Sequence, residues 1–294
     1  MRGRLPSWFT KRLPDPRQIS HTTVTLKEWN LNTICESALC PNIGDCFSQK
    51  TATFLILGRV CTRDCTFCAV RKGRPEEVDP SEAERISWAA SELGLHYVVI
   101  TSVTRDDLPD LGSGQFRAVI GLLKKDGFAV EALIPDFCGE RWALEEMLEA
   151  SPNVVAHNVE TVPRLYGQLR RSADYERSLR LLSWVKHIEP TVVTKSGLML
   201  GLGERFDEVV QVLEDLRTAG CEIVTMGQYL PPSKSHHPVF RFVSPEEFEE
   251  YGRIAKEMGF LAVASAPLVR SSFRASDLLE ASRDERRRKT GERP

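Results

Sequence analysis

Residues 53–68 read TFLILGRVCTRDCTFC, an apolar run that leads directly into three closely spaced cysteines. A short apolar run such as 53–57 is typical of a strand buried on both faces of a parallel sheet. The loop after it places Cys61, Cys65 and Cys68 at C-x3-C-x2-C spacing. Three thiolates on a four-iron cluster leave one iron open for a further ligand, whereas a fully ligated electron-transfer cluster has no open iron. The stretch therefore predicts the first strand of an α/β fold, followed by an iron–sulfur loop.

A zinc site or a set of structural thiols is the alternative for this loop. Tetrahedral zinc would require a fourth cysteine or histidine close by. The next such residue after Cys68 is His96, far along the chain. The spacing therefore favours an iron–sulfur cluster over zinc, although both interpretations stay open on these residues alone.

Downstream of this loop, strand-like apolar runs alternate with amphipathic helical patterns. The apolar runs occupy 97–101, 130–134, 154–157, 192–200, 223–226 and 261–264. The helical patterns cover 80–93, 116–125, 142–148, 175–186, 206–218 and 245–258. Parallel strands need such crossovers, and no glycine-rich nucleotide turn follows the first strand to indicate an open doubly wound sheet. We therefore predict an α/β fold, a partial TIM-type (β/α)6 barrel, with its chemistry at the carboxyl ends of the strands.

Two extensions are expected to flank the barrel, which should span 51–265. Residues 1–50 carry three of the cysteines but little hydrophobic periodicity, which predicts a loop-rich N-terminal extension lying over the barrel. Residues 266–294 form a C-terminal segment. Its last part, 281–294 (ASRDERRRKTGERP), is densely charged and is predicted to be disordered.

Composition argues against several classes of protein. The 294 residues carry a formal net charge of −2, so no basic field indicates a nucleic-acid partner. No apolar run reaches the length of about 18 residues that a membrane span requires. The first residues are basic and rich in proline, without the apolar segment of a secretory signal, which predicts a cytoplasmic protein.

Six of the eight cysteines fall between Cys35 and Cys68. In a chain of this size without an export signal, clustered cysteines bind metal more often than they form disulfides. Cys35, Cys40 and Cys46 form a C-x4-C-x5-C motif, whose spacing alone would also suit zinc or free thiols. Beside the first cysteine loop, this motif indicates a second, auxiliary cluster.

Together these motifs make the chain similar to the lipoyl synthase family of radical S-adenosylmethionine (SAM) enzymes. Members of that family carry C-x4-C-x5-C upstream of C-x3-C-x2-C, CPN as at 40–42, and an aromatic residue at the position of Phe67. Their Arg-Ser-Ser-Tyr motif matches Arg-Ser-Ser-Phe at 270–273, with Phe in place of Tyr. Further similar stretches, within a resemblance over 30–275, are TSVTRDDLPD (101–110), EALIPDF (131–137), AHNVETVPRLY (156–166), TKSGLMLGLGE (194–204) and QYLPPS (228–233).

The resemblance implies two [4Fe-4S] clusters. The first cysteine motif would hold the cluster whose open iron binds SAM, and the second motif would hold the auxiliary cluster. The fourth ligand of the auxiliary cluster would be Ser272, so that Ser272 and the cysteines of the first motif form the catalytic set. A hydroxyl is a weak iron ligand beside thiolates, which predicts a labile bond. On the residues alone, Ser271 and Ser272 are more typical of a turn or a helix cap.

The resemblance also implies the reaction and its partners. Two sulfur atoms would be inserted at C6 and C8 of a protein-bound octanoyl-lysine, with the auxiliary cluster as sulfur donor, which makes the chain a sulfurtransferase of lipoate biosynthesis. Implied partners are octanoylated lipoyl carrier domains (2-oxoacid dehydrogenase E2 subunits and the glycine cleavage H protein), a ferredoxin- or flavodoxin-type reductant and an iron–sulfur carrier protein. No nucleic-acid or membrane partner is expected, and a monomer is expected.

Two other classes of protein share part of this pattern. Another radical SAM enzyme, such as a biotin-synthase-like sulfur inserter or a dehydrogenase with an auxiliary cluster, would carry the first cysteine motif. The second motif together with Arg-Ser-Ser argues against it. A non-enzymatic iron–sulfur or zinc scaffold would not need a full β/α repeat with polar strand ends.

Polar residues at predicted strand ends are candidates for contacts with SAM. Asn158 and Glu160 follow the fourth predicted strand, where a carboxylate can accept hydrogen bonds from ribose hydroxyls; a strand-end turn is the alternative. Lys195 lies within an apolar strand, where an unpaired ammonium would be costly, so it is predicted to pair with the SAM carboxylate if it points into the barrel. Arg171 or Arg177 would suit the same carboxylate, or would lie on a solvated helix face.

Other reactive side chains are expected to be structural. Cys138 and Cys221 stand in apolar contexts and are predicted to be buried thiols. The pair Asp106 and Asp107 is expected to position neighbours or to pair with Arg105, because radical hydrogen abstraction needs no general base.

Overall fold

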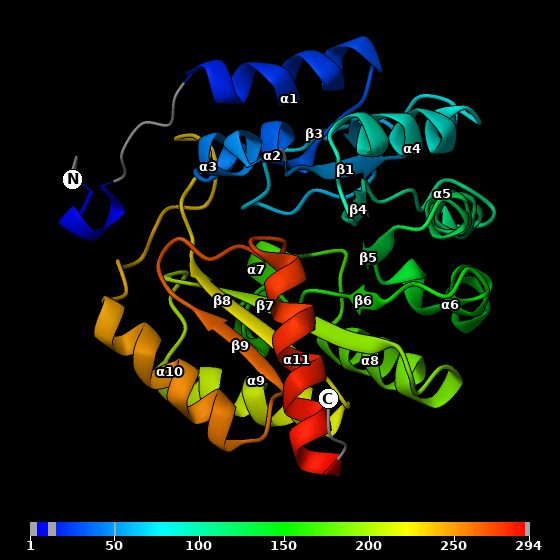
Figure 1. The fold of residues 1–294 in the computed structure, drawn as a ribbon. Coiled ribbons are helices and arrows are strands. Elements are labelled where there is room, and N and C mark those ends of the chain that lie inside the picture. The colour runs from blue at the N-terminus through cyan, green and yellow to red at the C-terminus, as the bar shows by residue number, and fades with distance from the viewer. Residues whose placement is uncertain (1–4, 11–15, 50, 292–294) are drawn as a thin grey trace.

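The computed structural model describes residues 5–10, 16–49 and 51–291 of the chain. Its centre is a seven-stranded parallel sheet in the order β1-β4-β5-β6-β7-β8-β9 (Figure 1). Spatial order equals chain order, and no pairing among the described residues joins β9 to β1, so the sheet is a partial barrel. The predicted strands are confirmed as β1 (Thr53–Ile56), β4 (Tyr97–Ser102), β5 (Ala129–Leu133), β6 (Val154–Ala156), β7 (Val193–Leu200), β8 (Ile223–Gln228) and β9 (Ala262–Ser265).

Helices connect successive strands and surround the sheet (Figure 1). The predicted helices are confirmed as α4 (Glu82–Glu92), α5 (Ser113–Lys125), α6 (Arg141–Leu148), α8 (Tyr175–Ile188), α9 (Phe206–Thr218) and α10 (Pro245–Glu257). Shorter elements are η1 (Ser7–Phe9), β2 (Val60–Cys61), β3 (Arg71–Lys72), η2 (Phe137–Gly139), η3 (Pro163–Leu165) and α7 (Tyr166–Leu169). The core lies between the strands and the apolar faces of these helices, as with Ile56 and Phe116, which are both fully buried. In the described part of the chain, no helix is long and apolar enough to cross a membrane.

The N-terminal extension contains more helix than predicted. It forms α1 (Pro16–Glu28), α2 (Ile34–Ser37) and α3 (Ile43–Ser48) beside β1 and α4 (Figure 1). Buried threonines help to anchor α1: Thr22 donates a hydrogen bond to the carbonyl of Phe47 at 2.8 Å, and Thr25 donates to Glu92 at 2.9 Å. Because polar side chains make these contacts, the hydrophobic periodicity is weak and the helix was not predicted. Residues 1–4, 11–15 and 50 lie outside the described part.

The prediction of a disordered tail at 281–294 is wrong for its described part. Helix α11 (Ala275–Thr290) runs through it, along the edge strand β9 (Figure 1). The helix buries its own Leu279 and Ser282 almost fully, and its Arg286 pairs with Glu222 at the start of β8. Charges spaced three and four residues apart also pair along the helix and support it. Residues 292–294 lie outside the described part.

A fully buried ion pair closes the floor of the barrel. Lys195 Nζ contacts the two carboxylate oxygens of Glu131 at 2.8 and 3.1 Å, and the Tyr97 hydroxyl donates to the same carboxylate at 2.8 Å. Burial and the neighbouring Glu131 charge raise the pKa of Tyr97, so this hydroxyl stays a donor. Alternate residues of β7 share a face, and Gly197 lines the cavity inside the barrel. Lys195 therefore also points inward, two residues closer to the amino end of the strand. The lysine thus points into the barrel, which was the condition for its predicted pairing with the SAM carboxylate, but its partner is Glu131.

We expect Lys195→Met to lower the free energy of unfolding by about 3–5 kcal/mol, because it leaves the buried Glu131 carboxylate without its counter-charge. The double variant Lys195→Met/Glu131→Gln should recover most of that loss. Urea unfolding followed by circular dichroism measures both changes. A single variant within about 1 kcal/mol of the parent would show that the pair does not support the barrel.

Candidate functional site

A cavity of about 470 Å³ opens at the carboxyl ends of the strands. Its walls come from the ends of β4 to β8, from the N-terminal extension and from the segment that follows β9. Cys35 and Cys40 of the second cysteine motif line it, together with Cys65 and Cys68 of the first motif and Ser272. Parallel strands present their loops at one rim, which is how segments far apart in the sequence share this cavity.

The first cysteine loop follows β1 and includes the short strands β2 and β3, which pair with each other. The amide of Arg63 donates to Cys61 Sγ at 3.4 Å, and Lys72 Nζ donates to the carbonyl of Cys65 at 3.0 Å. Burial raises the pKa of the Cys65 thiol, and it raises that of Cys68 to about 11. These thiols are therefore protonated at neutral pH until a metal displaces their protons.

The second cysteine loop is carried by the short helices of the N-terminal extension. Cys35 lies on α2, whose N-cap Thr33 accepts a hydrogen bond from the amide of Glu36. Cys40 follows that helix, and Cys46 lies on α3. Burial raises the pKa of Cys35 to about 11. The loop therefore offers three thiols from a backbone that is ordered by its own helices.

The donor chemistry of the cavity fits two iron–sulfur clusters. None of the eight cysteines forms a disulfide, and six of them belong to the two cysteine motifs, of which Cys35, Cys40, Cys65 and Cys68 line the cavity. Soft thiolates are the ligands that iron–sulfur clusters prefer. In 5–10, 16–49 and 51–291, no three His, Cys, Asp or Glu side chains are close enough to hold a single metal ion. A four-iron cluster is wider than one ion, so its thiolates stand further apart.

The predicted SAM contacts Asn158 and Glu160 lie together at the end of β6 and line the cavity. Asn158 Nδ2 donates to Glu160 Oε1 at 3.1 Å, and the hydroxyl of Ser271 donates to Asn158 Oδ1 at 3.0 Å. Burial raises the pKa of Glu160. Glu160 also adopts a left-handed backbone with φ of 66°, a costly conformation that a non-glycine residue keeps when its surroundings demand it.

Two other predicted contacts are not brought to the cavity. Lys195 lies beneath it in the ion pair with Glu131, and Arg171 is exposed to solvent. Arg177, the alternative to Arg171, instead pairs with Asp136 at 3.2 Å.

The structure places two arginines at the cavity that were not among the predicted SAM contacts, Arg170 and Arg270. Arg170 donates through one nitrogen to the carbonyls of Asn158 and Val159 at 3.0 and 3.1 Å, while its Nε is buried without a partner among the described residues. Burial lowers the pKa of Arg270, against the opposing charges nearby. Arg270 opens the Arg-Ser-Ser-Phe motif, which pointed to this segment but not to a SAM contact. Arg170 carries no local sequence signal: it adjoins the exposed Arg171, and spacing cannot tell which of the two points inward.

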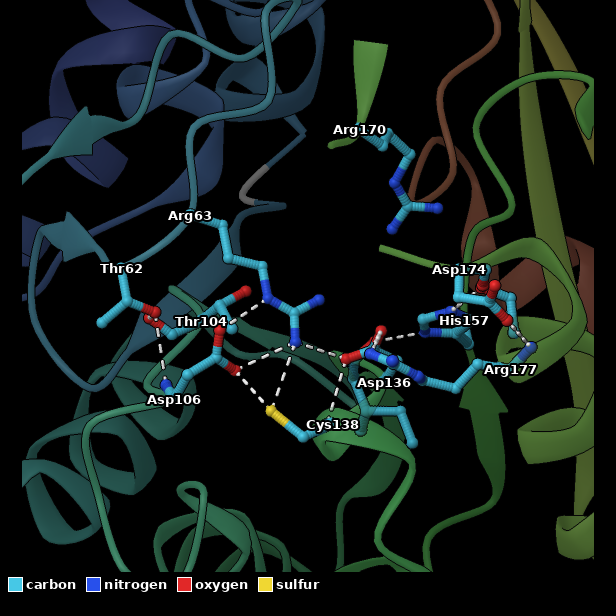
Figure 2. A network of polar contacts seen from close by, with 12 residues as sticks. Thr62, Arg63, Thr104, Asp106, Asp136, Cys138, His157, Arg170, Asp174 and Arg177 are labelled. Carbon is cyan, nitrogen blue, oxygen red and sulfur yellow. Dashed lines mark hydrogen bonds and ion pairs between the residues drawn. The ribbon is translucent and has the colours of Figure 1, made fainter. Parts of the chain in front are cut away.

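A network of charges binds the first cysteine loop to the rim of the barrel (Figure 2). Arg63, in the middle of that loop, contacts both oxygens of Asp106 at 2.7 and 2.9 Å and Asp136 at 2.6 Å. Asp136 follows β5 and also holds Arg177 of α8. Of the two aspartates predicted to pair with Arg105, Asp107 does so, at 2.9 Å. Asp106 forms its ion pair with Arg63 instead. The network thus joins the cluster loop to two strand ends and a helix.

Cys138 belongs to this network, so its prediction as a buried thiol is wrong. It is exposed, its backbone φ is 54°, and its thiol donates to Asp106 at 3.1 Å (Figure 2). The apolar sequence around Cys138 includes the neighbouring Phe137, which is buried. The tight turn at Cys138 directs its own side chain outward instead. Cys221 is fully buried, as predicted.

His157 is a neutral imidazole beneath the same network. Its Nδ1 lies 2.9 Å from the carbonyl of Ile134, and its Nε2 lies 3.0 Å from the hydroxyl of Ser178. A carbonyl can only accept, so the proton sits on Nδ1 and Nε2 accepts from the hydroxyl. Burial, with the nearby Arg170 charge, lowers the pKa of His157 to about 4. The ring therefore adds no charge to the rim at neutral pH.

The Asp136 carboxylate should make stability depend on pH in the acid range. Burial alone would raise its pKa, but the hydrogen bond and charge of Arg63 outweigh burial and lower it to about 2. A lowered carboxyl pKa contributes stability above the unfolded value near 4, and this contribution is lost as pH falls towards 2. Asp136→Asn should remove on the order of 2 kcal/mol of that dependence, measured by urea unfolding from pH 5 to pH 2.

Asp107→Asn is the matched control, because the Asp107 side chain is 39% exposed in its pair with Arg105. Arg105 lowers the pKa of Asp107, but solvent reaches this carboxylate and screens the pair, so the variant should change the pH dependence of stability much less than Asp136→Asn does. Equal slopes for Asp136→Asn and the parent would show that Arg63 does not hold an ionised Asp136.

Comparison with known proteins identifies the family. A profile of the radical SAM superfamily matches residues 55–216. The lipoyl synthase of Caldanaerobacter subterraneus is 50% identical over 284 residues, 96% of this chain and 100% of that protein. The lipoyl synthase of Aquifex aeolicus is 53% identical over 256 residues, 86% of this chain and 93% of that protein.

Solved structures agree on the fold. Methylornithine synthase (PylB) superposes with a TM-score of 0.50 at 14% identity, covering 89% of this chain and 81% of that one. Streptococcus suis SuiB bound to its precursor peptide superposes with a TM-score of 0.55 at 10% identity, covering 88% of this chain and 56% of that one. At such low identity these likenesses concern architecture alone. From its curated relatives, the chain belongs to the lipoyl synthase family of the radical SAM superfamily.

Proposed function

We propose a division of labour among the residues of the rim cavity for the reaction of this family. Lipoyl synthases are sulfurtransferases that use SAM and two [4Fe-4S] clusters to insert sulfur at C6 and C8 of a protein-bound octanoyl-lysine. We assign the SAM-binding cluster to Cys61, Cys65 and Cys68. The second cysteine motif and Ser272 are assigned to the auxiliary cluster. The observation that carries this assignment is that Ser272, from beyond the last strand, lines the same cavity as both cysteine loops.

The bound clusters and SAM supply a carbon radical that can abstract hydrogen from an unactivated alkyl chain, which acid–base side chains cannot do. The chain's own residues bind and orient the reactants. Asn158 and Glu160 face the cavity with oxygen atoms suited to ribose hydroxyls. Arg170 and Arg270 bring buried guanidinium groups, which suit the carboxylate of SAM in place of the predicted Lys195 and Arg171.

Apolar side chains provide a path for the octanoyl chain. Leu133, Ile134 and Met199 line the cavity that both cysteine loops share, together with Leu39 of the N-terminal extension. An apolar wall excludes water from a reactive radical and holds a flexible alkyl chain by burial. This wall supports a hydrocarbon substrate over a polar one.

The three segments of the chain divide these tasks in our proposal. Residues 1–50 carry the auxiliary cysteines, 51–265 form the SAM barrel, and 266–294 supply Ser272. The octanoyl-lysine would arrive on lipoyl carrier domains of the 2-oxoacid dehydrogenase E2 or glycine cleavage H type. A ferredoxin- or flavodoxin-type reductant and an iron–sulfur carrier protein would complete the cycle. We place the reaction in the cytoplasm, where cysteines that form no disulfide, such as these eight, stay reduced.

The test is anaerobic turnover of an octanoyl-lysine peptide with SAM and dithionite by the reconstituted protein. The parent should form 5′-deoxyadenosine and a doubly thiolated peptide, which mass spectrometry detects. Deoxyadenosine without sulfur insertion would instead favour another radical SAM activity. Zinc in place of iron, with neither product, would contradict the assignment.

Ser272→Ala should separate the two halves of the reaction. We expect it to retain deoxyadenosine formation but to lose sulfur insertion by at least about 100-fold, since removing a metal ligand should cost no less than removing a residue that hydrogen-bonds to one. Cys68→Ala should lose both products. Ser276→Ala, whose hydroxyl contacts only Asp277 among the described residues, is the control and should match the parent. Full sulfur insertion by Ser272→Ala would contradict its assignment as a ligand.

A further inference from the structure

The segment that carries Ser272 crosses the rim of the barrel as an irregular loop. We call residues 266–272, between β9 and α11, the closing loop. Its backbone is joined to β8: Ala266 donates to the carbonyl of Met226 at 3.2 Å, and Gln228 donates to the carbonyl of Pro267 at 3.1 Å. A Cβ at Gly227 would overlap the carbonyl oxygen of Val269, so glycine allows the loop to lie directly on the strand.

These backbone contacts hold the start of the loop, but Ser272 lies several residues further along. Two side-chain hydrogen bonds hold the remainder of the loop, one from Asn42 of the N-terminal extension and one from Ser271 of the loop itself. We propose that Asn42 and Ser271 are positioning residues that fix the closing loop and so present Ser272 to the second cysteine motif. This inference rests on the proposed role of Ser272.

Asn42 supplies the bond on the side of the auxiliary cysteines. It stands two residues after Cys40, is 1% exposed, and donates through Nδ2 to the carbonyl of Leu268 at 2.7 Å. Asn42 is also the N-cap residue of α3, a position where asparagine commonly caps the helix with its side chain. Here the side chain makes no such cap. Its donor is used across 226 residues of sequence to bind the closing loop instead.

Ser271 supplies the bond on the side of the barrel. Its hydroxyl donates to Asn158 Oδ1 at 3.0 Å, and the amide of the same Asn158 donates to Glu160 at 3.1 Å. The loop is thereby tied to the strand end that we assign to SAM. Because Ser271 and Ser272 are adjacent, a fixed Ser271 restricts where the Ser272 hydroxyl can point. The two serines thus have different tasks: the first anchors the loop and the second lines the cavity.

The first measurement is hydrogen–deuterium exchange of the cluster-free protein with reduced thiols. The amides of Val269 and Phe273 donate to carbonyls within this segment, at 3.0 Å each, and report its opening. Asn42→Asp, which cannot donate, and Ser271→Ala should each exchange these amides roughly five- to tenfold faster, the range expected for one lost hydrogen bond. Ser271→Thr restores a hydroxyl and should restore protection.

Controls separate this effect from general destabilisation. Ser48→Ala removes a hydroxyl whose contact is with Asp45 in α3, so it should leave the closing loop unchanged. The amide of Tyr229, bonded to Leu200 at 2.8 Å, should keep its exchange rate in every variant. Asn42→Ala, which introduces no buried charge, repeats the test if Asn42→Asp fails to fold.

The second measurement is iron release to a chelator from protein reconstituted with the auxiliary cluster alone, after Cys61, Cys65 and Cys68 are replaced by alanine. Asn42→Asp and Ser271→Ala should release iron on the order of tenfold faster, with Ser271→Thr near the parent, as for other residues that position metal ligands. Unchanged exchange in the cluster-free variants would overturn the inference. Faster exchange with unchanged iron release would overturn the role of Ser272 as a ligand, while the anchoring of the loop would stand.

Discussion

All seven strands of the sheet run in one direction, and this constraint determines where the protein can do chemistry. Parallel strands end at a common rim, so every loop that follows a strand faces the same space. The cysteine loop after β1, the turn after β6 and the closing loop after β9 meet there although they are far apart in the chain. The buried Lys195–Glu131 pair fills the opposite end of the barrel. The cavity is therefore open at the rim and closed below.

The charged side chains at this rim hold one another in place through ion pairs within the protein itself. Arg63 is 7% exposed and lies between two carboxylates, one of which is fully buried. Burying such charges is costly unless they are paired, and here the pairing joins the cluster loop to the ends of two strands. The pairing fixes Arg63 in the wall of the cavity, which Cys65 and Cys68 of the same loop also line. Preorganisation of this kind keeps ligands in place for a cluster whose open iron must also accept SAM.

The site that we propose for the auxiliary cluster depends on contacts between residues far apart in the sequence. The cysteines assigned to it lie in the N-terminal extension and the serine assigned to it lies beyond the last strand, and neither segment belongs to the repeating barrel. Hydrogen bonds from Asn42 to Leu268 and from Ser271 to Asn158 span 226 and 113 residues. A weak ligand such as a hydroxyl needs this support, because the iron–oxygen bond alone does little to hold a loop.

The amino-acid sequence alone determined the strands, the main helices, the barrel and the positions of the two cysteine motifs, because periodicity and spacing are local properties of the chain. The family also followed from these motifs. The sequence did not reveal α1, which buries threonines, or the helix through 281–290, whose charges pair with one another and with Glu222. It also did not show that Lys195 pairs with Glu131, that Arg170 rather than Arg171 enters the cavity, or that Cys138 faces solvent. Those outcomes depend on which distant side chains meet at the rim and in the barrel, and only the tertiary structure brings them together.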